Sequence, residues 1–87
     1  MILVVGMARS GVAAARLLKS RGQSVFVTDS GKPVGSGELD AIGIPWEAGQ
    51  HTVEHFLQAD EIVVRPGVPM NIPPLEAARA KGVPVIS

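Results

Sequence analysis

The chain alternates short apolar runs with stretches of helical periodicity, and a glycine or proline turn separates most of them. The first apolar run, Ile2–Val5, is rich in β-branched residues and has no polar face, which is typical of a strand buried on both sides of a parallel sheet. The helical period that follows places Gly11, Ala14, Ala15 and Leu18 on one face. Strands that alternate with helices in so short a chain predict parallel β-α-β units with right-handed crossovers.

The same patterns divide the whole chain into five strands and four helices. We expect strands at Ile2–Gly6, Ser24–Asp29, Ile44–Glu47, Glu61–Val64 and Val83–Ile86. We expect helices from Ser10 to Gly22, from Glu38 to Ile42 with Ser36 as cap, from Thr52 as cap through Leu57, and from Pro73 to Gly82. The predicted fold is a Rossmann-like three-layer α/β domain, with a five-stranded parallel sheet in the order 3-2-1-4-5 and helices on both faces.

Length and composition exclude several classes of protein. With 87 residues the chain forms one domain, which we place at residues 1–87. Its eight basic and eight acidic side chains leave no positive excess for a nucleic-acid partner. Cysteine is absent, which excludes disulfides and thiol-ligated metals. No apolar segment approaches the roughly 20 residues that span a bilayer, so we expect no membrane partner and a cytoplasmic location.

A glycine turn lies between the first strand and the first helix. Gly6 permits the tight turn and Gly11 allows the helix to approach the strand, so that free N–H groups at the helix start face a phosphate. Asp29 ends the second strand 18 positions beyond Gly11, close to the spacing at which a carboxylate binds the nucleoside part of a ligand. Ala8 stands where a dinucleotide fingerprint has its middle glycine. The turn therefore predicts a nucleotide diphosphate more strongly than NAD.

A second turn follows the fourth strand. In the predicted strand order, the first and fourth strands separate at the topological switch point, where ligands lie at the carboxyl ends of the strands. Pro66 and Gly67 would then face the segment from Ala8 to Ser10 across the crevice.

No other group of residues predicts chemistry. His51 and His55 are four positions apart, but no third ligand accompanies them, so we expect no metal site. We also expect the exchange of His51 to leave nucleotide binding almost unchanged. The segment Gly31–Pro33 lacks the spacing of a P-loop, and no nucleophile–base arrangement is recognisable. We therefore expect no catalytic residue in this chain.

Three segments together carry a resemblance to a known family. They read VVGMARSGVAAARLLKSRG, VFVTDS and ADEIVVRPGVPMNIPPLEAARAKGVPVIS, and they leave only the stretch near 32–49 poorly matched. The chain resembles the N-terminal domain of the Mur ligases of peptidoglycan synthesis, and among them the group that adds D-glutamate.

The resemblance implies that this domain binds the UDP part of UDP-N-acetylmuramoyl-L-alanine. It implies that a central domain supplies the sites for ATP and Mg²⁺, and that a C-terminal domain helps to bind D-glutamate. By position, Arg9 and Ser10 would hold the diphosphate, Asp29 to Gly31 would contact the uracil or its ribose, and Pro66 and Gly67 would line the other wall. The complete set of expected UDP-binding residues is Ala8, Arg9, Ser10, Gly11, Asp29, Ser30, Gly31, Pro66 and Gly67.

The chain departs from the family pattern at three positions. Ala8 replaces the middle glycine, and Gly31 stands where a longer side chain covers the uracil. Arg65 replaces a small hydroxyl residue, and its side chain either contacts the diphosphate or points into solvent.

Two further hypotheses stay open. One is an NAD-binding Rossmann domain of an oxidoreductase, and the other is a nucleotide-binding module without chemistry. Under the ligase hypothesis, we expect the chain to be a domain excised from a three-domain enzyme and to be inactive alone.

Overall fold

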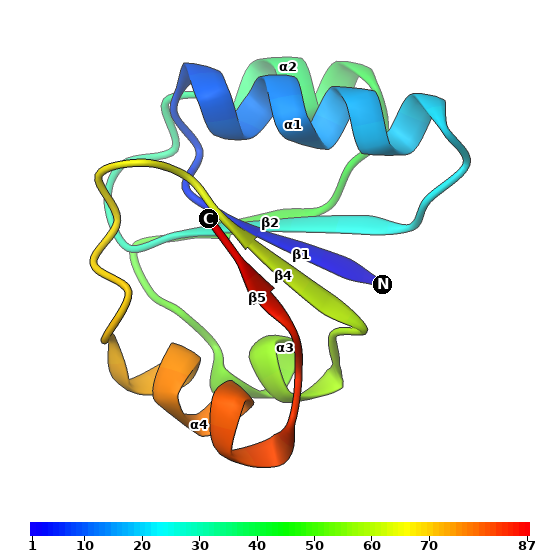
Figure 1. Ribbon diagram of the computed structural model, residues 1–87. Helices are drawn as coiled ribbons and strands as arrows, with labels where there is room; N and C mark the ends of the chain where they lie inside the picture. The colour runs from blue at the N-terminus through cyan, green and yellow to red at the C-terminus, as the bar shows by residue number, and fades with distance from the viewer.

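All five strands run parallel in one sheet, in the order β3-β2-β1-β4-β5 (Figure 1). The computed structural model describes residues 1–87. The strands are β1 (Ile2–Val5), β2 (Val25–Asp29), β3 (Trp46–Ala48), β4 (Glu61–Val64) and β5 (Val85–Ile86). Val5 lies opposite both Thr28 and Val64, so β1, β2 and β4 end at the same edge of the sheet.

Two helices cover each face of the sheet, as Figure 1 shows. The helices α1 (Arg9–Ser20) and α2 (Ser36–Ala41) cover one face, and α3 (Val53–Gln58) and α4 (Pro73–Lys81) cover the other. The predicted Rossmann-like α/β fold with this strand order is therefore confirmed. None of the four helices has the length and apolar character needed to cross a membrane.

The strands alternate their side chains between two separate cores. Val4 and Val27 are fully buried on the α1–α2 side, where Leu39 of α2 packs with them. Leu3 and Val5 are fully buried on the α3–α4 side. Because successive residues of a strand face opposite ways, both faces of β1 are apolar, as a central parallel strand requires.

The starts of α2 and β3 differ from the sequence prediction. Helix α2 begins at Ser36 itself, and the Ser36 hydroxyl donates to the Pro33 carbonyl (2.9 Å) instead of capping the helix. Strand β3 begins at Trp46 instead of Ile44, because Pro45 has no N–H to donate, although its carbonyl accepts a hydrogen bond from the Val27 amide (3.1 Å).

The predictions for α3, β5 and α4 have mixed outcomes. Thr52 precedes α3 as predicted, but its side chain makes no cap and donates to Glu47 instead. Strand β5 contains only the last two of its four predicted residues, Val85 and Ile86. Gly82 ends α4 with a positive φ of 92°, as the glycine there predicts.

Candidate functional site

A cavity of about 450 Å³ opens where β1, β2 and β4 end. Asp29, Ser30 and Gly67 line it, together with Pro69, Ile72, Pro73 and Pro74. The connection after β1 leads to α1 on one face, and the connection after β4 leads to α4 on the other, so the cavity lies at the predicted topological switch point.

Two glycines shape the turn that borders this cavity. Gly6 has a φ of 115°, and a Cβ at this position would overlap the side chain of Arg65. A Cβ at Gly11 would overlap the carbonyl oxygen of Gly6. The close approach of α1 to the end of β1 therefore requires both glycines, for the reasons that the sequence predicts.

The first amides of α1 are available to a ligand. Ala8 precedes the helix in an extended conformation, and Val12 is the first residue whose amide bonds back, to the Ala8 carbonyl (3.0 Å). The amides from Arg9 to Gly11 therefore have no acceptor within the helix. Exposed amides and the positive end of the helix dipole together suit an anion.

Asp29 ties together the two turns beside the cavity. Its Oδ2 accepts a hydrogen bond from the Met7 amide (2.7 Å), and its Oδ1 accepts one from the Gly31 amide (2.7 Å). Each carboxylate oxygen keeps a lone pair for a ligand. Asp29 thus fixes the positions of the turns after β1 and β2, and direct contact with a nucleoside stays a prediction.

Arg65 spans the switch point from the end of β4 to the start of α1. Its Nε donates to the Ser10 hydroxyl (2.9 Å), and the side chain is half-buried over Gly6. The sequence left two orientations open for the Arg65 side chain, toward the diphosphate or into solvent. The orientation into solvent is wrong, because Nε binds Ser10. The terminal nitrogens of the guanidinium have no hydrogen-bond partner in the protein.

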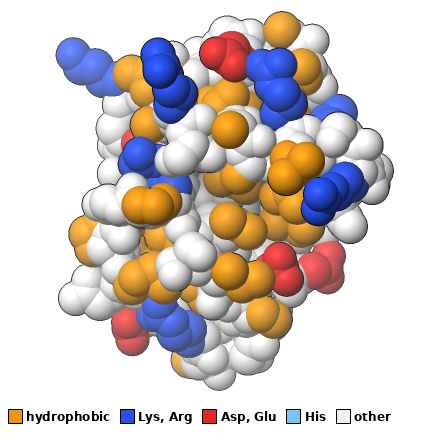
Figure 2. Space-filling view, turned by 45° about the horizontal axis from the view of Figure 1, so that its top comes forward, with side chains coloured by type: hydrophobic (Ala, Val, Ile, Leu, Met, Phe, Trp, Pro, Cys, Tyr) orange, Lys and Arg blue, Asp and Glu red, His pale blue; other side chains and the backbone are white.

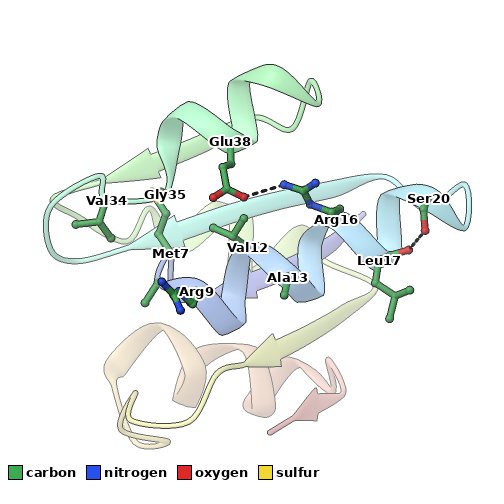
Figure 3. A pocket seen from close by; sticks show the side chains of 11 residues that line it. Met7, Arg9, Val12, Ala13, Arg16, Leu17, Ser20, Val34, Gly35 and Glu38 are labelled. Atoms are coloured by element: carbon green, nitrogen blue, oxygen red, sulfur yellow. Dashed lines mark hydrogen bonds and ion pairs between the residues drawn. The ribbon is translucent and has the colours of Figure 1, made fainter.

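A second hollow, of about 690 Å³, runs along α1 outside the switch point (Figure 3). Val12 and Leu17 of α1 lie on one side of it and Val34 on the other, and the ion pair between Arg16 and Glu38 (2.8 Å) crosses it. Figure 2 shows hydrophobic side chains in the middle of this face with Lys and Arg side chains around them.

The predicted site residues are divided between these two hollows. Ala8 and Arg9 line the groove along α1, and Asp29, Ser30 and Gly67 line the switch-point cavity. The others border the same turns without lining either hollow: Ser10, Gly11, Gly31 and Pro66. We assign the candidate site to the switch-point cavity, because Asp29 lines it and because the turn at Gly6, which also lines it, leads directly to the free amides of α1. Arg65 packs over this turn.

The structure also reveals a polar cluster that the sequence analysis missed. Thr28 is fully buried, and its Oγ1 contacts both Glu47 Oε2 (2.9 Å) and His51 Nδ1 (2.8 Å). The Glu47 carboxylate also accepts hydrogen bonds from the Thr52 amide (2.8 Å) and the Thr52 hydroxyl (2.6 Å). The one signal in the sequence was a threonine inside an apolar strand, since a buried hydroxyl needs partners.

Burial and hydrogen bonding shift the pKa values of two members of this cluster. Burial raises the pKa of Glu47, but the donors from Thr52 and Thr28 and the nearby charge of His55 outweigh it and lower the pKa below its ordinary value. Burial lowers the pKa of His51, against a smaller opposing effect of Asp29 and Glu47. At neutral pH Glu47 is therefore ionised and His51 is neutral.

The two histidines occupy different environments. His51 precedes α3 and lines the switch-point cavity, whereas His55 lies within α3 and stacks on Phe26 with ring centroids 4.1 Å apart. The sequence analysis expected the exchange of His51 to leave nucleotide binding almost unchanged, but the turn after β3 places His51 beside Asp29 on the cavity wall. No three His, Cys, Asp or Glu side chains come together as metal ligands would.

Comparisons with known proteins agree on one family. The model of the MurD-like N-terminal domain of Mur ligases matches residues 1–87. The UDP-N-acetylmuramoylalanine–D-glutamate ligase of Geobacter sp. (strain M21) is 48% identical over 99% of this chain and 20% of that protein. The ligase of the same name from Bacteroides fragilis (strain YCH46) is 43% identical over the same shares. This chain thus spans about a fifth of the length of the relatives it matches.

The crystal structure of the UDP-N-acetylmuramate–alanine ligase MurC from Thermotoga maritima has the same fold. It superposes with a TM-score of 0.81 over 98% of this chain and 20% of that one, at 24% sequence identity.

Proposed function

This chain belongs to the MurD-like N-terminal domain family of the Mur ligases, and from that premise we propose that its switch-point cavity binds the UDP part of UDP-N-acetylmuramoyl-L-alanine. The proposal is supported by the names of the relatives, which contain this precursor. The observation that carries it is the row of unpaired amides from Arg9 to Gly11, which begins α1 directly after the turn at Gly6 on the cavity wall.

In this proposal the diphosphate lies over the start of α1. The amides of Arg9 and Ser10 and the Ser10 hydroxyl donate to its oxygens, and the helix dipole favours its charge. The free terminal nitrogens of Arg65 add a charge-assisted contact from the opposite wall, beside Pro66 and Gly67. The methyl group of Ala8 keeps the diphosphate farther from the backbone than the middle glycine of an NAD-binding turn would.

The nucleoside lies toward the end of β2. Asp29 offers carboxylate lone pairs to donors of the ribose or the uracil, and Ser30 offers its hydroxyl. Gly31 has no side chain to cover the base, so one face of the uracil stays open.

The same proposal gives this chain a binding role within a larger ATP-dependent ligase. In the complete enzyme, the other parts of the chain would hold ATP and Mg²⁺, which would supply a phosphoryl group to the alanine carboxylate with release of ADP; the amine of D-glutamate would then displace phosphate. The residues of this chain do not fit Mg²⁺ and ATP, because it has no P-loop sequence and no cluster of three metal-ligating side chains. We therefore propose that this chain alone is inactive. We also propose that the complete enzyme works in the cytoplasm on peptidoglycan precursors.

A ¹H–¹⁵N NMR titration tests the proposal. UDP-N-acetylmuramoyl-L-alanine is added to this chain, and NAD is added to a parallel sample, because Asp29 at the end of β2 also suits the ribose diol of NAD. We expect shifts at Ala8–Gly11, Asp29–Gly31 and Pro66–Gly67 with the UDP ligand alone. Equal or larger shifts with NAD would favour the oxidoreductase hypothesis, and no shifts with either ligand would contradict the proposal.

A further inference from the structure

His51 lies on the wall of the switch-point cavity together with Asp29 and Ser30. Its ring is half-buried and meets Phe56 edge-on, with ring centroids 5.5 Å apart and an interplanar angle of 83°. Its Nδ1 lies 2.8 Å from Thr28 Oγ1. The ring is therefore held in one orientation by an aromatic contact and a hydrogen bond.

The hydrogen-bond network determines which nitrogen of His51 carries the proton. The ionised Glu47 carboxylate (2.9 Å) and the Gln50 carbonyl (3.4 Å) can only accept, so the single proton of the Thr28 hydroxyl points to these acceptors and mainly to the nearer Glu47 Oε2. Thr28 Oγ1 then offers only a lone pair to His51, and His51 must donate from Nδ1. Because the neutral imidazole carries one N–H, its Nε2 is an acceptor.

This Nε2 has no partner within the protein. None of the side-chain hydrogen bonds of the chain involves it, and no buried side-chain nitrogen or oxygen lacks a partner. Since Nε2 is unpaired, it must be accessible, and His51 borders the cavity. Asp29 offers a second set of acceptor lone pairs in the same wall.

We infer that His51 is a further nucleoside-binding residue, whose Nε2 accepts a hydrogen bond from an N–H or O–H donor of the nucleoside bound in the cavity. Uridine has two kinds of donor that suit this position, the N3–H of the base and the hydroxyls of the ribose. The inference rests on the proposed UDP-binding function, and it assigns to His51 a part in selecting the nucleoside.

The test compares three variants of this chain by isothermal titration with UDP. In His51→Asn the side-chain amide takes the place of Nδ1 and still donates to Thr28, but the acceptor at the Nε2 position is lost. In His51→Gln the amide oxygen reaches the position of Nε2. His55→Asn is the matched control, because His55 is a half-buried histidine that stacks on Phe26 and does not line the cavity.

We expect His51→Asn to lose roughly two- to tenfold in affinity for UDP, which is the contribution of one neutral hydrogen bond. We expect His51→Gln to retain most of the affinity and His55→Asn to match the unmodified chain. Equal affinity of His51→Asn and the unmodified chain would overturn the inference, and so would an equal loss in His55→Asn.

Three further ligands identify the donor that His51 recognises. CDP lacks the N3–H of uracil, 2′-deoxy-UDP lacks the 2′-hydroxyl of the ribose, and 3′-deoxy-UDP lacks the 3′-hydroxyl. If His51 accepts from the base, the preference for UDP over CDP shrinks in His51→Asn; if it accepts from the ribose, the preference for UDP over one of the two deoxy ligands shrinks. A variant that keeps all three preferences unchanged overturns the inference.

The same data separate this inference from the function on which it rests. If the unmodified chain does not bind UDP, the proposed function itself fails. If the unmodified chain binds UDP with NMR shifts at Asp29 and Gly67 while His51→Asn binds equally well, only the role of His51 fails.

Discussion

The absence of a Cβ atom at Gly11 allows the close approach of α1 to β1 at the candidate site. The amides of α1 can reach a ligand because the helix starts almost against the end of β1, and a Cβ at Gly11 would overlap the Gly6 carbonyl oxygen. The backbone there cannot yield without moving the turn, since Gly6 itself is packed under Arg65. The requirement for glycine at this position therefore comes from packing and not from its φ angle.

Exchange of Gly11 for alanine should destabilise the fold strongly. We expect Gly11→Ala to lower the free energy of unfolding by about 2 kcal/mol or more, because the added methyl group meets backbone. In a chain of this size, that loss lowers Tm by roughly 10 °C in a calorimetric scan. Gly37→Ala is the matched control: its Cβ meets nothing within 4 Å, and the residue lies in α2. This control should gain about 0.5 kcal/mol, since alanine favours the helix. A Gly11 variant as stable as the control would contradict the packing argument.

Asp29 should influence both the turns and the ligand. In Asp29→Ala the Met7 and Gly31 amides lose their acceptor, so we expect faster amide exchange at both residues together with a roughly tenfold loss of UDP affinity. Hydrogen exchange followed by NMR and a UDP titration measure the two effects. Asp29→Asn keeps one carbonyl oxygen as an acceptor and should lie between alanine and the unmodified chain. Loss of affinity without any change in amide exchange would mean that Asp29 acts on the ligand alone.

At the scale of elements, one buried polar cluster joins β2, β3 and the start of α3. Thr28 contributes the hydroxyl, Glu47 the acceptor, and Thr52 two donors to that acceptor. The cluster fixes the turn after β3 against the end of β2, and this turn carries His51 into the cavity.

The cluster should make the stability of the domain depend on pH. The folded-state pKa of Glu47 is below its unfolded value of 4.5, so its stabilising contribution is present above that pH and is lost as the pH falls through the folded pKa. The folded-state pKa of His51 is below 6.5, so stability also decreases as the pH falls below 6.5. Urea unfolding between pH 7 and pH 3 should therefore show stability decreasing in two steps.

Glu47→Gln separates these two steps. Because the neutral amide weakens the hydrogen bonds from Thr28 and Thr52, we expect the variant to be about 1–2 kcal/mol less stable at pH 7. It should lose the step at the lower pH and keep the decrease below pH 6.5 that comes from His51. A variant with an unchanged lower step would show that other carboxylates cause it.

The sequence predicts elements better than it predicts contacts between them. Apolar runs such as Ile2–Val5 and the stop at Gly82 determine the fold class, because their patterns are local. The start of β3 was misplaced because the pairing of an edge strand depends on its neighbour, and Pro45 lies at that boundary. The environment of His51 depends on Thr28 and Glu47 in two other elements, and no local pattern encodes that contact.

Arg65 links β4 to α1 and should act on the diphosphate and not on the nucleoside. We expect Arg65→Met to lower the affinity for UDP roughly tenfold and to leave the affinity for uridine almost unchanged. The loss should shrink at high salt, because the contact is ionic. Arg79→Met is the control: it removes the same charge from an exposed ion pair with Glu76 on α4. Equal losses in the two variants would indicate an effect of net charge alone.

At the scale of the whole molecule, binding must come from local groups, because the chain has no net charge to attract an anion. The walls of the cavity come from one edge of one sheet, from the turns after β1, β2, β3 and β4 and the start of α4. These walls contact a bound nucleotide from one side only. The relatives have about four times this length of chain outside the matched region, which can contribute the other side.

Because the cavity encloses the ligand from one side only, we can predict the relative affinities of the isolated chain for UDP and for the full precursor. We expect UDP and UDP-N-acetylmuramoyl-L-alanine to bind this chain with affinities within roughly threefold of each other, because the muramoyl-alanine half has no wall here and its ordering offsets what it gains. Isothermal titration of both ligands measures the ratio. In a complete D-glutamate ligase such as the Geobacter relative, the other domains should favour the full precursor by a much larger factor. If the isolated chain favours the full precursor by more than roughly tenfold, a contact for the muramoyl-alanine half must exist within these 87 residues, and the groove along α1 would be the first place to look for it.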